Sequence, residues 1–533
     1  MTPFASGAPV GDPQPVASTM HMGITNHPRD HLHRSADCQS AGSPAGSRPR
    51  FASARPAQCV VHLPSGRRTP EPGSVTRSQL PRNNHPTTLG IPFRLALLLA
   101  FLSLAPIPVL RAQTLLFTNG IIHTASHGTM TNGILLVSSN RITGVYDPAR
   151  GEAPPALPAD TTTIDLKGAQ LYPGLIAVDS ALGLTEVEAI RASQDLNEVG
   201  DFTPDVESWI AVNPDSELLP VTRANGITYF EPVPQGKIVA GQSALMSMDG
   251  WTWEQMLVKR PVALHLFWPE FGLDTTPKEK LADPAKATSL ADQDKERRRR
   301  VAAIQNFFDD ARAYARARSS AHPPTLVPAW EGMLPALRGE VPVVIHAGEL
   351  RQIKSAVNWS LTNHLQMVLA GGMDAWRVAR LLATNHIPVI YEQVFTQPVR
   401  DTEPLDVHYT APEVLRQAGV TVIFSTGGSA FEAAMARNLP YHAAQAIAFG
   451  YPEEEALKGL TLYPAQCLGV ADRLGTLEPG RDATFFICNG SIFDLQTSVQ
   501  RLWIAGHEIN LSSRHTRLYE KYQNRPRLGV GHH

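Results

Sequence analysis

The sequence lacks the features of a disulfide scaffold, a nucleic-acid binder or a multi-span membrane protein. Four cysteines in 533 residues are too few for a fold held together by disulfides. The formal net charge of −2 argues against a basic surface that binds nucleic acid. A hydrophobic content of 43% is ordinary for a globular protein and excludes disorder along the whole chain. These absences leave a globular α/β chain of the size of an enzyme.

The first 88 residues lack lysine and any lasting apolar periodicity. They hold nine arginines and 13 prolines, interspersed with small residues. Such a composition cannot build a packed core. We interpret residues 1–88 as a disordered leader or as a stretch translated upstream of the true start; a basic, flexible arm is the alternative.

A secretory signal peptide is predicted over residues 89–112. Arg94 precedes an apolar run over residues 95–104, and Ala112 is a small residue at the expected cleavage point. The run is shorter than the roughly 20 residues of a transmembrane helix. An uncleaved N-terminal anchor is the alternative. After cleavage we expect no stable membrane span and a periplasmic or secreted protein.

Cleavage would change the charge and the cysteine content of the folding chain. Residues 1–112 hold 11 of the 47 basic and four of the 49 acidic side chains, so residues 113–533 carry a formal charge of −9. This charge disfavours nucleic acid as a partner. Only Cys467 and Cys488 remain, either as a disulfide or as two buried thiols.

Three segments and a tail are predicted after residue 112. Residues 113–170 read as short strands joined by turns, and residues 472–515 return to this pattern. Between them, residues 171–471 alternate buried strands with helices, including a long helix over 294–318. This alternation predicts a parallel sheet, open or closed into a barrel. Residues 516–533 form the tail.

Several motifs along the chain form a recognisable set. They are Pro173-Gly174-Leu175-Ile176, Pro342-Val343-Val344-Ile345-His346-Ala347 and the run over residues 460–483. This set resembles the amidohydrolase superfamily, in particular its imidazolonepropionase-like branch. The resemblance covers residues 113–515. It implies an α/β fold, a TIM-like (β/α)8 barrel inserted in a small β-sandwich domain formed by both ends of the mature chain. It also implies hydrolysis of non-peptide or cyclic carbon–nitrogen bonds.

The metal ligands implied by the resemblance are mostly missing. The superfamily holds one or two divalent metals by a His-x-His after the first barrel strand, single histidines after the fifth and sixth, and an aspartate after the eighth. His346 matches the fifth-strand ligand. Asp179-Ser180-Ala181 replaces the His-x-His, and Gly371 and Gly427 replace the last two ligands. Ala181, Gly371 and Gly427 have no ligating side chain, so the site is degenerate or rebuilt.

Two interpretations stay open, so the sequence does not decide whether the protein is an enzyme. In the first, it is a hydrolase with Asp179, His346 and Glu349 as catalytic residues, and Asp179 and His346 as ligands of one divalent Zn, Mn or Fe. Further candidates for this site are His265, Glu392 and His408. In the second, no metal binds, and the chain is an inactive binding protein or the partner of an active homologue. A small molecule is the expected ligand, and a homo-oligomer is a further alternative.

Each candidate residue also has a purely structural explanation. His346 could be a hydrogen-bonded core histidine, and Asp179 a hydrogen-bond acceptor at a strand end. Glu349 could begin the helix after the fifth strand, where the helix dipole favours an acid. His265 is expected to pack among apolar neighbours, and His408 to be exposed in a polar loop.

N-terminal sequencing of the exported protein tests the signal peptide. We expect cleavage after Ala112, so that the mature chain begins at Gln113, because a small residue there follows the apolar run. An exported chain that still carries residues 95–104 would contradict this prediction.

Overall fold

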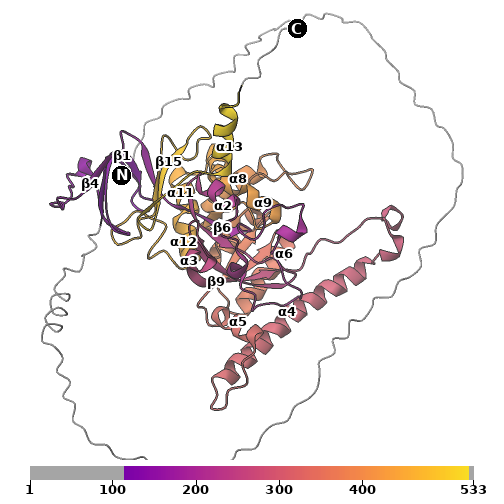
Figure 1. The fold of residues 1–533 in the computed structure, drawn as a ribbon. Coiled ribbons are helices and arrows are strands. Elements are labelled where there is room, and N and C mark those ends of the chain that lie inside the picture. Colours follow the sequence, from indigo (N-terminus) through magenta and orange to yellow (C-terminus); the bar gives the residue numbers. More distant parts are fainter. Residues whose placement is uncertain (1–112, 527–533) are drawn as a thin grey trace, which may run out of the picture. The chain divides into compact units, whose positions relative to one another are not determined.

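The structure, a computed structural model, describes residues 113–526, which contain two eight-stranded sheets (Figure 1). The predicted leader and signal peptide lie outside the described residues, as does the end of the predicted tail, residues 527–533. Between residues 113 and 526, no helix is both long enough and apolar enough to cross a membrane.

The first sheet combines strands that precede the barrel in the sequence with strands that follow it. Strand β5 lies between β1 and β14, parallel to β1 and antiparallel to β14. The two ends of the described chain therefore share one sheet, while their arrangement as a sandwich stays a prediction. The strands are β1 (Thr114–His123), β2 (Thr129–Ser138), β3 (Arg141–Tyr146), β4 (Thr162–Asp165), β5 (Gln170–Pro173), β14 (Phe485–Cys488), β15 (Val499–Ile504) and β16 (His507–Ile509).

Three aromatic rings form the centre of this sheet's core. Phe485 lies 5.1 Å from Phe117 in an edge-to-face contact and 4.9 Å from Trp503 in a stacked contact, between ring centroids. All three side chains are buried. Because β1 supplies one ring and β14 and β15 supply the others, this contact fastens the two ends of the chain together.

The second sheet forms a nearly closed barrel. Its order is β13-β12-β11-β10-β9-β8-β7-β6. No β13–β6 ladder is present among the described residues, but Ser425 Oγ donates to the backbone oxygen of Val178 at 2.8 Å and bridges the gap. The strands are β6 (Leu175–Ser180), β7 (Ile227–Pro232), β8 (Val239–Ser247), β9 (Leu257–Phe267), β10 (Val343–Ala347), β11 (Met367–Gly371), β12 (Val389–Tyr391) and β13 (Val422–Phe424).

One strand departs from the all-parallel order of a (β/α)8 barrel. Strand β8 runs antiparallel to both β7 and β9, whereas the other neighbouring strands are parallel. A short turn over residues 233–238 replaces the helix expected between β7 and β8. The finding is therefore a mixed α/β fold with an eight-stranded barrel.

The helices follow the predicted alternation over the second half of the barrel. The long predicted helix is α4, which begins four residues earlier, at Leu290, because Ser289 caps it through the backbone N–H of Asp292. Its expected apolar positions Ile304, Phe308 and Ala311 are buried. The helices are α2 (Leu218–Arg223), α3 (Trp253–Met256), α4 (Leu290–Arg318), α5 (Pro328–Leu337), α6 (Leu350–Thr362), α7 (Ala379–Thr384), α8 (Val407–Gln417), α9 (Ala430–Met435), α10 (Leu439–Ala448), α11 (Glu453–Leu460), α12 (Leu462–Cys467) and α13 (Arg514–Gln523).

Gly174 lies where the chain passes from the first sheet into the barrel. A Cβ atom at this position would lie 2.2 Å from Thr228 Oγ1 and 2.7 Å from Thr484 Cγ2. Both distances are far below van der Waals contact, so only glycine lets β6 enter the barrel beside these threonines. This explains the glycine of the Pro-Gly-Leu-Ile motif.

Substitution of Phe485 by alanine tests the role of the aromatic core. We expect the free energy of unfolding to fall by about 3–5 kcal/mol, because the cavity would lie between Phe117 and Trp503. Chemical denaturation measures this change. Leu495→Ala is the control, since Leu495 is 75% exposed and its loss should change stability by no more than about 0.5 kcal/mol. Equal effects of the two substitutions would contradict the prediction.

Candidate metal centre

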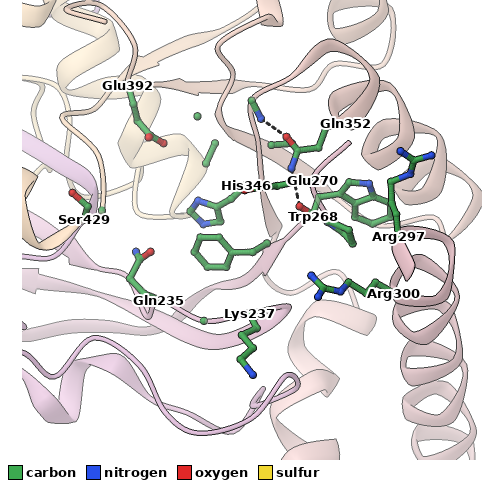
Figure 2. A pocket seen from close by; sticks show the side chains of 18 of the residues that line it. Gln235, Lys237, Trp268, Glu270, Arg297, Arg300, His346, Gln352, Glu392 and Ser429 are labelled. Carbon is green, nitrogen blue, oxygen red and sulfur yellow. Dashed lines mark hydrogen bonds between the residues drawn. The ribbon is translucent and has the colours of Figure 1, made fainter. Parts of the chain in front are cut away.

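A cavity of about 750 Å³ opens at the carboxyl ends of the barrel strands (Figure 2). Its inner wall carries Asp179 from β6, His346 from β10 and Glu392, the residue after β12. Its outer wall comes from the first turns of α4, from which Arg297 and Arg300 reach towards the cavity. This end of a barrel is where loops bring side chains from different strands together.

Three donor groups converge at the inner wall. One ligand atom each from Asp179, His346 and Glu392 lies within 4.8 Å of the others. His346 Nδ1 is 3.8 Å from Asp179 Oδ2. Both carboxylate oxygens of Asp179 and Oε1 of Glu392 are buried without a hydrogen-bond partner among the described residues. Buried carboxylate oxygens without partners are costly, so this arrangement calls for a cation or a shared proton.

The backbone holds Asp179 in an uncommon conformation. Its φ of 49° lies in the left-handed region, which few residues other than glycine adopt. The backbone N–H of Asp179 donates to Glu231 Oε2 at 3.1 Å, and this bond stabilises that conformation. A Cβ atom at residue 428 would lie 2.7 Å from Asp179 Oδ1, so Gly428 leaves the room that the carboxylate needs.

His346 is held by a ring on one face and a hydrogen bond at its edge. The ring of Phe267 stacks on it with centroids 4.1 Å apart, and His265 Nδ1 lies 3.1 Å from its Nε2. Burial lowers the pKa of His346 to about 4, although the charge of Asp179 opposes this shift. His346 is therefore neutral at pH 7, which is the form that binds metals.

Glu392 faces Asp179 across the site. Burial raises the pKa of Glu392 well above its ordinary value, and the neighbouring charge of Asp179 raises it further. Two carboxylates at such close range cannot both be ionised without a compensating cation. Two oxygen donors and one imidazole are a donor set that suits Zn, Mn or Fe.

The structure brings together two of the three catalytic residues predicted from the sequence. Asp179 and His346 lie in the group, whereas Glu349 lies outside both the group and the cavity lining. Its carboxylate caps α6 by accepting from the backbone N–H groups of Arg351 and Gln352. This is the structural explanation given above for Glu349. The third member of the group is Glu392, one of the further candidates.

The two other histidine candidates differ in their surroundings. His265 is buried, as expected, but its partners are polar: His346 and Ser243. His408 was expected in an exposed loop, and this was wrong. It lies in α8, is buried, and its Nδ1 is 3.1 Å from the hydroxyl of Tyr391.

Burial or backbone conformation accounts for the residues found where the resemblance places further ligands. Ala181 is fully buried. Gly371 and Gly427 have φ values of 87° and 100°, which a histidine or aspartate would rarely adopt. Sequence reasoning did not find Glu231 or Ser243. The only signal for Glu231 is a single acid inside the apolar strand Ile227–Pro232.

Comparison with known proteins finds similarity to amidohydrolases. A family model described as the amidohydrolase family matches residues 336–509. The amidohydrolase tasK of Hapsidospora irregularis is 22% identical over 393 residues, which span 66% of this chain and 37% of that protein. The crystal structure of an amidohydrolase from Thermotoga maritima MSB8 shares the fold with a TM-score of 0.63 at 24% identity, over 74% of this chain and 99% of that one.

Residues 336–509 thus match the amidohydrolase family model, which confirms the resemblance at the level of the family. Members of this family typically use a divalent metal, and the group of Asp179, His346 and Glu392 offers three donors for one.

Glu392→Gln tests the opposed carboxylates in protein treated with a chelator. Wild-type protein should lose stability as pH rises from 4.5 towards the raised pKa of Glu392, because the folded state keeps a proton that the unfolded state releases. Glu392→Gln should not show this fall in stability, because glutamine does not titrate. At pH 7 its free energy of unfolding should exceed that of wild type by about 1–3 kcal/mol, the cost of an unsatisfied buried polar group.

Glu349→Gln is the matched control for this substitution. It removes a glutamate charge outside the cavity, so we expect no gain in stability at pH 7. Parallel pH profiles for wild type and Glu392→Gln, measured by chemical denaturation, would show that the two carboxylates do not oppose each other.

Proposed function

We propose that this chain is a hydrolase of the amidohydrolase family with a rebuilt site for one divalent metal. The observation that carries the proposal is the convergence of Asp179, His346 and Glu392 within 4.8 Å at the barrel mouth. The substrate class is a non-peptide or cyclic C–N bond, as in the imidazolonepropionase-like branch. The cavity of about 750 Å³ supports a small-molecule substrate.

The donor set fits a metal because its orphaned oxygens need one. Asp179, His346 and Glu392 would hold the ion, which when bound lowers the pKa of a water molecule and polarises a carbonyl oxygen. The stacked ring of Phe267 fixes the plane of His346. Gln235 and Lys237, from the turn between β7 and β8, line the same cavity and are the polar groups available to orient a substrate.

The site is rebuilt in the sense that a different strand supplies a ligand. The sixth and eighth strand positions hold Gly371 and Gly427, which cannot ligate, and Glu392 enters from β12 between them. The (β/α)8 classification is part of this proposal. Five of the seven strand pairs are parallel and support it, whereas β8 runs the other way.

A second candidate is an inactive binding protein of the same fold. The observation that favours it is the loss of side-chain ligands at Ala181, Gly371 and Gly427. We further propose that residues 113–533 act outside the cytoplasm, on the basis of the apolar run over residues 95–104. An active homologue as partner belongs with the second candidate, and a homo-oligomer is the alternative assembly.

Elemental analysis of the purified protein distinguishes the two candidates. We expect about one equivalent of Zn, Mn or Fe, and its loss by at least tenfold in His346→Ala, because one of three donors disappears. Hydrolysis of a panel of amides, hydantoins and dipeptides should require that metal and return when it is restored.

Glu349→Gln is the control, since Glu349 is nearby in the chain but outside the cavity. This variant should keep its metal. Metal-free wild-type protein that is inert towards the whole panel would favour the binding protein instead. Loss of metal in Glu349→Gln but not in His346→Ala would mean that the ligands are assigned wrongly.

A further inference from the structure

A continuous line of hydrogen bonds crosses the barrel interior and ends at His346. Ser243 Oγ donates to Glu231 Oε1 at 2.6 Å. His265 Nε2 lies 2.9 Å from Ser243 Oγ, and His265 Nδ1 lies 3.1 Å from His346 Nε2. These residues come from four neighbouring strands, β7 to β10. Glu231, Ser243 and His265 are fully buried, so bulk solvent does not reach them.

The direction of each bond follows from what each group can donate. A carboxylate can only accept, so the hydroxyl hydrogen of Ser243 points to Glu231. The oxygen of Ser243 then accepts from His265, which places the hydrogen of His265 on Nε2. The same hydrogen also faces Glu231 Oε1, a second acceptor, which is 3.4 Å from His265 Nε2. In a neutral His265 ring, Nδ1 is left as an acceptor, and His346 then donates to it from Nε2.

We propose that Glu231, Ser243 and His265 are positioning residues that hold His346 in its Nε2–H tautomer. In this tautomer the Nδ1 atom of His346 carries a free lone pair. That atom is the one that faces Asp179 Oδ2, at 3.8 Å. The hydrogen-bond line therefore selects Nδ1 as the ligand atom of His346. This inference rests on the proposed metal site, but the tautomer itself exists without a metal.

The arrangement at the end of the line supports a cation. A neutral Nδ1 lone pair and the orphaned oxygens of Asp179 are all electron-rich, and no hydrogen lies between them in the Nε2–H tautomer. Such groups repel one another in a buried site unless a cation or a shared proton lies between them. The network thus prepares the site for an ion by taking away the hydrogen that would otherwise bridge His346 and Asp179.

Glu231 orients a second ligand as well. Its other oxygen, Oε2, accepts the backbone N–H of Asp179, the residue with a left-handed φ of 49°. One buried carboxylate therefore holds both Asp179 and, through Ser243 and His265, His346. Partners of this kind around a metal ligand typically contribute 10- to 100-fold to metal affinity.

Nuclear magnetic resonance of protein with ring-¹⁵N-labelled histidine tests the tautomer in the chelator-treated full chain. The His346 signals are those missing in His346→Gln. In wild type we expect the hydrogen on Nε2 and an unprotonated Nδ1 at pH 7. In His265→Phe the partner of Nε2–H is gone, so a mixture of tautomers should appear. The dissociation constant for Zn²⁺ should rise about 10- to 100-fold.

Two further variants keep the test decisive. His442→Phe removes a buried histidine outside the cavity lining, so it should change neither the His346 signals nor the Zn²⁺ affinity. His265→Gln keeps one donor and one acceptor and should restore the tautomer at least in part. An Nδ1–H form in wild type, or an unchanged spectrum in His265→Phe, would overturn the inference. If no variant and no wild-type protein binds Zn²⁺, the proposed function fails, while the wild-type spectrum still decides the tautomer.

Discussion

Two opposed carboxyl groups with buried oxygens that lack hydrogen-bond partners are the constraint on which the site depends. Asp179 and Glu392 face each other beside a neutral imidazole, and their buried oxygens have no hydrogen-bond partners among the described residues. An arrangement of this kind is unfavourable in the folded protein by itself, because each lost hydrogen bond to water goes uncompensated. It persists only because the rest of the barrel holds the strands in place. In the proposed metal site, the same unfavourable energy would become affinity for a divalent cation.

The barrel holds these strands in place partly through a group of polar side chains on one side of its interior. Most strand residues pack as an apolar core, but Glu231, Ser243 and His265 form a buried and fully satisfied chain of hydrogen bonds. Such networks specify one arrangement more sharply than apolar packing does, because each group has few alternative partners. The antiparallel strand β8 is part of this design, since it carries Ser243 between Glu231 and His265.

The family, the alternation of strands and helices and two of the three donors could be predicted from the sequence. Asp179 and His346 were found because they lie near the ends of buried strands, at motif positions. Glu349 was equally plausible in the sequence, since it follows the same strand as His346, yet its carboxylate caps a helix. Glu392 could be placed only as a further candidate, because the loop after β12 offers no motif around it. The direction of β8 could not be predicted, because a buried strand has the same apolar pattern in either direction.

What the sequence determined by itself is local: apolar runs that become strands, caps that begin helices, and Gly174 where the chain enters the barrel. It also determined that the expected ligands at Ala181, Gly371 and Gly427 are missing. Only the tertiary structure decided which side chains meet at the barrel mouth. Asp179, His346 and Glu392 are more than 40 residues apart in sequence, and their meeting depends on the tilt and closure of the barrel. Distances of a few ångströms between such residues are a property of the packed strands, which no local pattern encodes.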